Sequence, residues 1–92
     1  MVDASHDNSK RDPLQQPAVV ADVGAQLRAG EPNILGIMLE SHLQAGRQEL
    51  VDKATLAYGQ SITDGCLGFD STRQVLEAFA NDVRRSLNVS VR

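Results

Sequence analysis

The chain has 92 residues, a formal net charge of −3, 41% hydrophobic residues and only 3% aromatic residues. This length fits one domain or part of one, with a core built mainly from Val, Ile, Leu and Ala. Because basic residues are outnumbered by acidic ones and are scattered, the composition argues against nucleic acid as a partner. No apolar run approaches the roughly 18 residues that a membrane-spanning helix needs, which argues against a membrane partner.

The cysteine content and the start of the chain bear on its location. A single cysteine, Cys66, excludes an internal disulfide framework and is typical of a reducing compartment. No signal-peptide pattern opens the chain. We therefore expect a cytoplasmic location.

The first half of the chain predicts a strand, a loop and a helix in that order. Residues 1–4 are suited to a short strand, and residues 5–13 contain hardly an apolar group, which is typical of a loop. Pro17 fits the first turn of a helix, and Gly30 with Pro32 fits its end. Between them, apolar residues fall at helical spacing: Val19, Val20, Val23 and Leu27.

The second half predicts a strand, a long loop and a final helix. The near-continuous apolar run at residues 34–39 is typical of a strand buried on both faces of a parallel sheet. No period holds from residue 44 to 68, and structureless loops of this length are usually functional. Ser71 and Gln74 then form a capping-box pattern. The helix is predicted from apolar residues at amphipathic spacing: Val75, Leu76, Phe79, Ala80, Val83 and Leu87.

This alternation of strands and helices predicts an α/β fold with a parallel sheet. Two strands cannot bury such a sheet by themselves. We therefore expect the chain to be part of a larger fold.

Three side chains that suit a metal ion follow the predicted strands. His6 comes after the first strand and Glu40 ends the second, so both lie at the carboxyl edge of a parallel sheet. Their separation of 34 residues is close to one βα unit of an eight-fold barrel, roughly 250 residues divided by eight. Asp64 lies in the long loop that starts at the same edge. One imidazole and two carboxylates predict a divalent-metal site, although a solvated histidine and a turn-forming Asp are the ordinary interpretations of each residue alone.

Other polar residues near this edge have plainer interpretations. His42 lies on the same strand face as Glu40, and Cys66 lies two residues after Asp64. We interpret His42 as a supporting hydrogen-bonding group and Cys66 as a small buried thiol. There is no standard glycine-rich phosphate loop and no serine nucleophile elbow. Four basic residues are interpreted as solvated surface charges: Lys10, Arg11, Arg47 and Lys53.

Three motifs together resemble one enzyme family. VDASHDNS (2–9), GIMLESHL (36–43) and AYGQSITDGCLGF (57–69) resemble the last quarter of class I 3-deoxy-7-phosphoheptulonate (DAHP) synthases. These metal-dependent transferases open the shikimate pathway to chorismate and the aromatic amino acids. The resemblance implies that residues 1–92 are the C-terminal part of a single TIM-type (β/α)8 barrel domain. The chain would supply strand seven, helix seven, strand eight and helix eight, incomplete on its own.

The resemblance also implies a reaction and a site. The family condenses phosphoenolpyruvate with erythrose 4-phosphate to give DAHP and phosphate, using a divalent metal ion such as Mn, Fe, Co or Zn. His6, Glu40 and Asp64 occupy the matching metal-ligand positions. Asp64 and His6 would be catalytic, with Asp64 contacting a sugar hydroxyl or relaying a proton. His42 and Gln48 match supporting positions, and the parent enzyme is expected to be a homo-oligomer.

Some parts of the family's site have no counterpart in this chain. The fourth metal ligand of the family is a cysteine early in the barrel, and Cys66 matches a different family cysteine. The arginines and lysines that hold the substrate phosphates also lie upstream. Asp7 stands where Ala or Gly is usual in the family. We therefore expect the isolated 92-residue chain to be unfolded, molten or aggregated and to show no turnover.

Two other hypotheses remain open at this stage. The chain would be a non-catalytic truncated remnant, or an interaction module that docks on another subunit. Alternatively, it would belong to a sister barrel that makes another 3-deoxy keto-acid phosphate, which the motifs fit less well. The sequence leaves open the physiological metal, the feedback amino acid and the oligomeric state.

Overall fold

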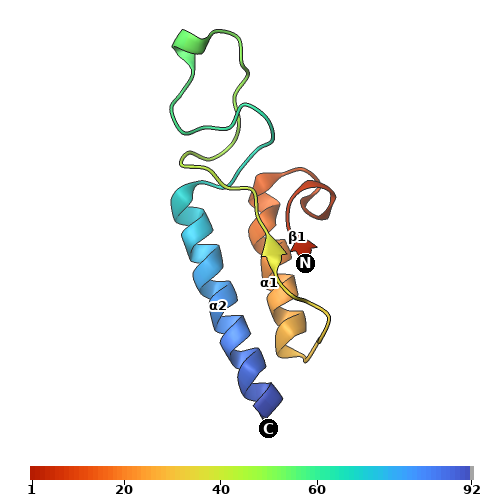
Figure 1. The fold of residues 1–92 in the computed structure, drawn as a ribbon. Coiled ribbons are helices and arrows are strands. Elements are labelled where there is room, and N and C mark those ends of the chain that lie inside the picture. The colour runs from red at the N-terminus through yellow and green to blue at the C-terminus, as the bar shows by residue number, and fades with distance from the viewer. Residues whose placement is uncertain (92) are drawn as a thin grey trace.

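The computed structural model describes residues 1–91, which form two helices and a pair of short parallel strands (Figure 1). The helices are α1 (Gln16–Arg28) and α2 (Phe69–Val91), and the strands are β1 (Val2–Asp3) and β2 (Ile37–Met38). Short 3-10 turns cover His6–Ser9, Pro13–Gln15 and Lys53–Thr55. The predicted order of strand, helix, strand, long loop and helix is confirmed.

The two strands pair in parallel, as predicted, but the second is shorter than expected. Val2 lies opposite Ile37, and the Ala4 N–H donates to the carbonyl of Met38 at 2.8 Å. The prediction of a strand over residues 34–39 buried on both faces is wrong for this chain. Leu35 is 90% exposed and Met38 40% exposed. The physical reason is that β1 is the one strand paired with β2 in residues 1–91, so nothing orders or covers the far edge.

The first helix follows its predicted signals and the second departs from them. Helix α1 has Pro17 in its first turn and is followed by Gly30 with a left-handed φ of 95°. Helix α2 starts at Phe69, so the predicted cap at Ser71 is wrong and Ser71 lies inside the first turn. The chain enters α2 directly from a β-bridge at Leu67, and the Thr72 N–H already donates to the carbonyl of Gly68 at 3.0 Å.

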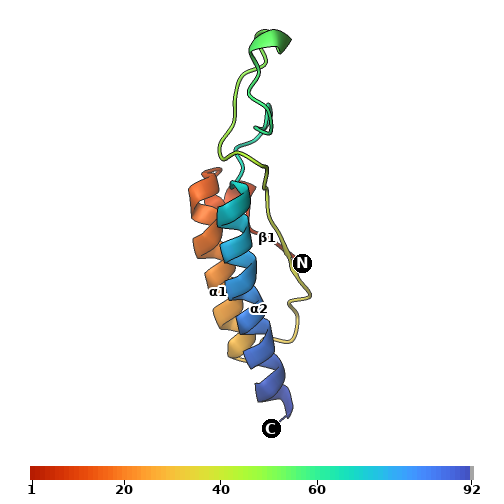
Figure 2. The same cartoon turned by 90° about the vertical axis from the view of Figure 1, so that its left-hand side faces the viewer.

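The helices lie side by side and run in the same direction, with the strands against one face of the pair (Figures 1 and 2). A small core joins both layers and consists of Ala4, Val20, Leu67 and Val75, with Val19, Ile37, Leu39 and Phe79 packed around it. Gly24 allows the close approach, because a Cβ there would lie 1.9 Å from Oδ2 of Asp82 on α2. Arg28 holds that carboxylate with an ion pair of 2.9 Å.

The long loop after β2 projects away from the helices (Figure 1). As predicted, residues 44–68 contain no helix or strand beyond one 3-10 turn and isolated bridges. The molecule is elongated, with extents of 57 × 23 × 16 Å. Within residues 1–91, neither helix has the length and apolar character needed to cross a membrane.

Candidate metal centre

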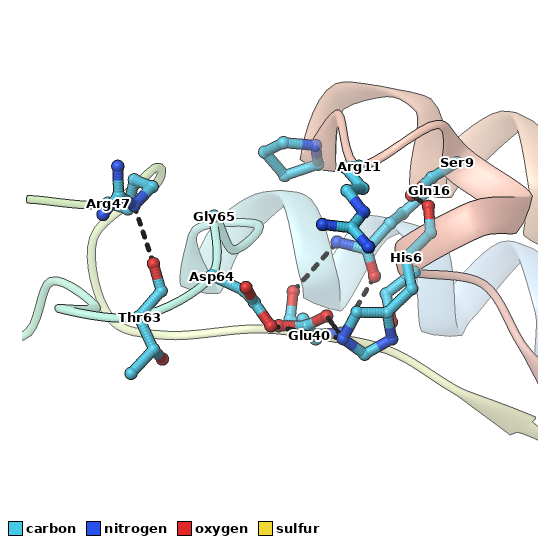
Figure 3. A pocket seen from close by; sticks show the side chains of 11 residues that line it. His6, Ser9, Arg11, Gln16, Glu40, Arg47, Thr63, Asp64 and Gly65 are labelled. Carbon is cyan, nitrogen blue, oxygen red and sulfur yellow. Dashed lines mark hydrogen bonds and ion pairs between the residues drawn. The ribbon is translucent and has the colours of Figure 1, made fainter.

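The structure brings His6, Glu40 and Asp64 together at the carboxyl edge of the strands (Figure 3). His6 Nε2 lies 2.9 Å from Oε1 of Glu40 and 3.2 Å from Oδ2 of Asp64. One ligand atom from each residue lies within 4.8 Å of the others. The convergence predicted from three separate segments is therefore present in the fold.

Backbone pairing explains why these segments meet. Parallel pairing of β1 with β2 places the residues that follow both strands at the same edge. The end of the long loop joins them because Leu67 N–H donates to the carbonyl of Glu40 at 2.9 Å. Asp64 lies three residues before this contact, which directs its carboxylate to His6.

Gln16 fixes the backbone of Glu40 from the start of α1. Its side chain is fully buried, and its Oε1 accepts from the Glu40 N–H at 2.8 Å. Its Nε2 donates to the Glu40 carbonyl at 3.1 Å. One side chain thus satisfies both backbone groups of this residue and links the helix to the strand end.

Asp3 and Ser5 hold the other side of the His6 ring. Nδ1 of His6 lies 2.9 Å from Oδ2 of Asp3 and 3.0 Å from Oγ of Ser5. Oδ1 of Asp3 accepts hydrogen bonds from the Ser5 hydroxyl and, at 2.8 Å, from the Ser5 N–H. His6 itself has a left-handed φ of 52°, a conformation that a non-glycine residue adopts only when its surroundings impose it.

These contacts shift two protonation equilibria. The Ser5 hydroxyl, and then His6, lowers the pKa of Asp3 to about 2. Hydrogen bonding to Asp3, and then to Asp64, raises the pKa of His6 above its ordinary value. Asp3 is therefore ionised at neutral pH, and His6 keeps its second proton to a higher pH than an isolated histidine.

The three side chains open onto a cavity of about 430 Å³ that also contains two arginines (Figure 3). Arg47 is occupied, since it donates to the carbonyl of Thr63 at 2.7 Å and pairs with Glu49 at 2.9 Å. For the side chain of Arg11, no hydrogen bond or ion pair is found in the described part of the chain. Arg11 and Arg47 are exposed, as expected for surface charges, but the structure adds that both line this cavity.

The other predicted residues lie outside this cavity. His42 Nδ1 accepts from the Leu43 N–H at 2.8 Å, so the ring faces its own backbone and not the site. Gln48 shapes the long loop instead, accepting from the Ala57 N–H at 2.9 Å. Cys66 is buried, which confirms the interpretation as a small buried thiol, and this burial raises the pKa of the thiol.

Three residues that hold the site are absent from the sequence-based set: Asp3, Ser5 and Gln16. The signal for the first two is a carboxylate and a hydroxyl just before a histidine at a strand end. Gln16 gives no such signal, because its partner lies 24 residues away and is a backbone group.

Comparison with known proteins gives consistent matches over nearly the whole chain. The model of the DAHP synthetase I family matches residues 1–77. The Phe-sensitive phospho-2-dehydro-3-deoxyheptonate aldolase of Escherichia coli is 46% identical over 84 residues, which are 91% of this chain and 24% of that protein. The phenylalanine-inhibited aldolase of Saccharomyces cerevisiae is 44% identical over 87 residues, with 91% and 24% of the two chains covered.

A solved structure agrees with these relatives. Phospho-2-dehydro-3-deoxyheptonate aldolase from Francisella tularensis superposes with a TM-score of 0.88 at 42% identity, covering 94% of this chain and 25% of that chain. The chain thus spans about a quarter of the length of the relatives that it matches. Sequence and fold lead to the same conclusion: this chain belongs to the DAHP synthetase I family.

Proposed function

We propose that residues 1–92 form the last quarter of a single (β/α)8 barrel domain, and that the complete barrel is a DAHP synthase. It would condense phosphoenolpyruvate with erythrose 4-phosphate to give DAHP and phosphate. Two observations support the barrel assignment. The chain matches about a quarter of each relative, and its order of β1, α1, β2 and α2 equals two βα units.

The observation that carries the proposed chemistry is the cluster of His6, Glu40 and Asp64. Ligand atoms about 2.1 Å from a common cation are expected to lie roughly 3.0–3.4 Å from each other. The separations around His6 Nε2 are 3.2 Å to Asp64, within this range, and 2.9 Å to Glu40, just below it. One imidazole with two carboxylates favours Mn, Fe, Co or Zn over the all-oxygen preference of Ca or Mg.

A divalent cation bound here would polarise the aldehyde carbonyl of erythrose 4-phosphate and so favour attack by carbon 3 of phosphoenolpyruvate. The solvent exposure of the three side chains indicates which of them would contact the substrate and which would hold the cation. The Asp64 side chain is 65% exposed and that of Glu40 20% exposed, so Asp64 is the better placed to contact a sugar hydroxyl or relay a proton. Glu40, held by Gln16, and His6 are assigned to binding and orientation.

The rest of the site belongs to the remainder of the barrel. A cysteine ligand and the main cations that hold the substrate phosphates are expected from the earlier βα units, with Arg11 of this chain as an additional cation in the cavity. The cytoplasmic location, the homo-oligomeric parent and the identity of the metal stay predictions. The activity is therefore proposed for the complete barrel and not for this chain alone.

The test uses a hybrid barrel, in which residues 1–92 replace the last quarter of the Escherichia coli relative. We expect phosphate release that requires both substrates and a divalent cation and that stops when a chelator is added. Glu40→Gln should lower kcat/KM by more than about a hundredfold, since even groups that only support a metal ligand cost 10–100-fold. The matched control is Glu77→Gln, an exposed carboxylate on α2 that pairs with Arg73.

Each result decides between the hypotheses. Turnover without a cation, or full turnover by Glu40→Gln, contradicts the proposal. A folded hybrid barrel with no turnover favours the non-catalytic remnant or interaction module. Turnover with a different phosphorylated aldose in place of erythrose 4-phosphate favours the sister barrel.

A further inference from the structure

The turn that follows His6 is held by backbone hydrogen bonds. The Arg11 N–H donates to the carbonyl of His6 at 2.7 Å, and the Asp12 N–H donates to the carbonyl of Ser9 at 3.1 Å. Lys10 and Arg11 have left-handed φ values of 55° and 61°, which non-glycine residues adopt only when their surroundings impose them. The backbone that carries Arg11 is therefore fixed directly to a residue that is proposed to bind metal.

This turn places two neighbouring cations in different cavities. Arg11 lines the cavity of the proposed metal site, and its side chain extends into that cavity (Figure 3). Lys10 instead lines a separate cavity of about 220 Å³ beside α1, together with Asp22. Substituting each cation in turn therefore separates an effect inside the metal-site cavity from an effect of overall charge.

The guanidinium group of Arg11 is available to bind an anion. Within residues 1–91 it has no hydrogen bond or ion pair, although two carboxylates line the same cavity. Those carboxylates, on Glu40 and Asp64, face His6 Nε2 at 2.9 and 3.2 Å. The cluster therefore leaves the charge of Arg11 without a partner in the described part of the chain.

The charges that line the cavity favour an anionic ligand. A divalent cation would balance the two carboxylates of the cluster. The second arginine, Arg47, is balanced by Glu49 through an ion pair of 2.9 Å. Among the described residues that line the cavity, Arg11 is then the one cation whose charge stays unbalanced. This chain thus contributes one excess positive charge at the opening of the site.

We propose that Arg11 binds the phosphate group of a substrate held beside the metal. A guanidinium presents its N–H donors as a planar fork that matches two oxygens of a phosphate, and such charge-assisted hydrogen bonds are strong. Both substrates of the proposed reaction carry a phosphate. This inference rests on the proposed function, and it adds a phosphate-binding residue from this chain to those expected from the earlier βα units.

The test is calorimetric titration of the hybrid barrel in the presence of Mn²⁺. Three ligands are titrated separately, so that no reaction occurs: inorganic phosphate, phosphoenolpyruvate and erythrose 4-phosphate. We expect Arg11→Ala to raise the Kd of inorganic phosphate and of at least one substrate about tenfold, the value of one charge-assisted hydrogen bond. The substrate with the larger increase is the one whose phosphate Arg11 contacts.

Lys10→Ala is the matched control, because it removes the same charge one residue away and from a different cavity. Its Kd values should stay within about twofold of those of the parent chain, since salt screens exposed charges that do not contact the ligand. Circular dichroism checks that each variant is folded. If Arg11→Ala does not fold, Arg11→Gln replaces it, because glutamine keeps much of the side chain without its charge.

Several outcomes would overturn the inference. These are no binding of inorganic phosphate by the parent hybrid barrel, an unchanged Kd of inorganic phosphate in Arg11→Ala, and an increase for inorganic phosphate with none for either substrate. An equal increase in Lys10→Ala would also overturn it, since the effect would then come from overall charge. A hybrid barrel that lacks turnover but binds phosphate in this Arg11-dependent way refutes the proposed function and leaves this inference standing.

Discussion

At the scale of single residues, the side chain of Gln16 holds the backbone of Glu40 in place. It is buried and forms two hydrogen bonds to the backbone of Glu40. The Glu40 carbonyl has a second donor in Leu67, but its N–H is paired with Gln16. Removing the amide therefore leaves the partly buried N–H of Glu40 without a partner, at the residue that is proposed to bind metal.

We expect Gln16→Leu to destabilise the hybrid barrel by about 1–3 kcal/mol, the usual cost of an unsatisfied buried group. The midpoint of urea unfolding measures this change. The neighbouring Gln15→Leu is the control, since Gln15 is exposed and its substitution should cost less than about 0.5 kcal/mol. Equal midpoints for the two variants would contradict the role given to Gln16.

The two arginines of the cavity should also differ in their effect. Arg47 is already bound to Thr63 and Glu49, whereas no side-chain partner of Arg11 is described within residues 1–91. We expect Arg11→Ala to raise the KM of a phosphate-bearing substrate about tenfold, the value of one charge-assisted hydrogen bond. Arg47→Ala should raise this KM less. Steady-state kinetics of the hybrid barrel with each variant measures both KM values, and a larger KM for Arg47→Ala than for Arg11→Ala would contradict the prediction.

At the scale of elements, the contact between α1 and α2 depends on one missing side chain. A Cβ at Gly24 would lie 1.9 Å from Oδ2 and 2.7 Å from Cγ of Asp82, which Arg28 holds in place. We expect Gly24→Ala to destabilise the hybrid barrel by about 1–3 kcal/mol, as overpacking does, despite the better helix propensity of alanine. Urea unfolding measures the loss.

The Asp82→Ala background provides the control for this helix contact. With the carboxylate removed, the nearest remaining atom is the Cβ of residue 82 at 3.1 Å, so most of the overpacking is relieved. Gly24→Ala should then cost less than about 1 kcal/mol, because the better helix propensity of alanine offsets the remaining close contact. A double-mutant cycle would therefore give a large coupling. Additive effects would mean that the two positions do not limit each other.

The elements themselves differed in how far the sequence predicts them. Helix α1 was predictable because its apolar period, Pro17 and Gly30 are all local signals. The length of β2 was not, because a strand needs neighbours that this chain does not supply. The prediction of a cap at Ser71 was wrong because α2 begins at Phe69, directly after the β-bridge at Leu67, and so starts earlier than the local sequence pattern indicates. Contacts between distant segments decided both differences.

The same distinction applies to the site. His6, Glu40 and Asp64 were predictable because parallel strands bring the residues after them to one edge. Asp3 and Gln16 were not among the predicted residues. Asp3 contacts His6 across a turn in which His6 is left-handed, and its signal is a carboxylate shortly before a histidine at a strand end. Gln16 binds backbone atoms, so it leaves no pattern in side-chain chemistry.

At the scale of the whole molecule, the shape is unlike that of an independent domain. The radius of gyration is 15.5 Å, against about 12 Å for a compact chain of this length. Apolar side chains such as Leu35 lie open to solvent. We expect the isolated chain to give no cooperative thermal transition by circular dichroism and to elute as a broad or aggregated species. The hybrid barrel is the control, and a sharp transition from a monomeric isolated chain would contradict this expectation.

The spacing of the three clustered side chains has a consequence for how the protein holds together. His6, Glu40 and Asp64 are separated by 34 and 24 residues along the chain. A cation held by all three would act as a crosslink that closes two loops, one that contains α1 and β2 and one formed by the long connection after β2. Removing the cation with a chelator would then lower the stability of these 92 residues in the complete barrel as well as stop the proposed reaction. The metal would therefore stabilise the fold in addition to its proposed catalytic role.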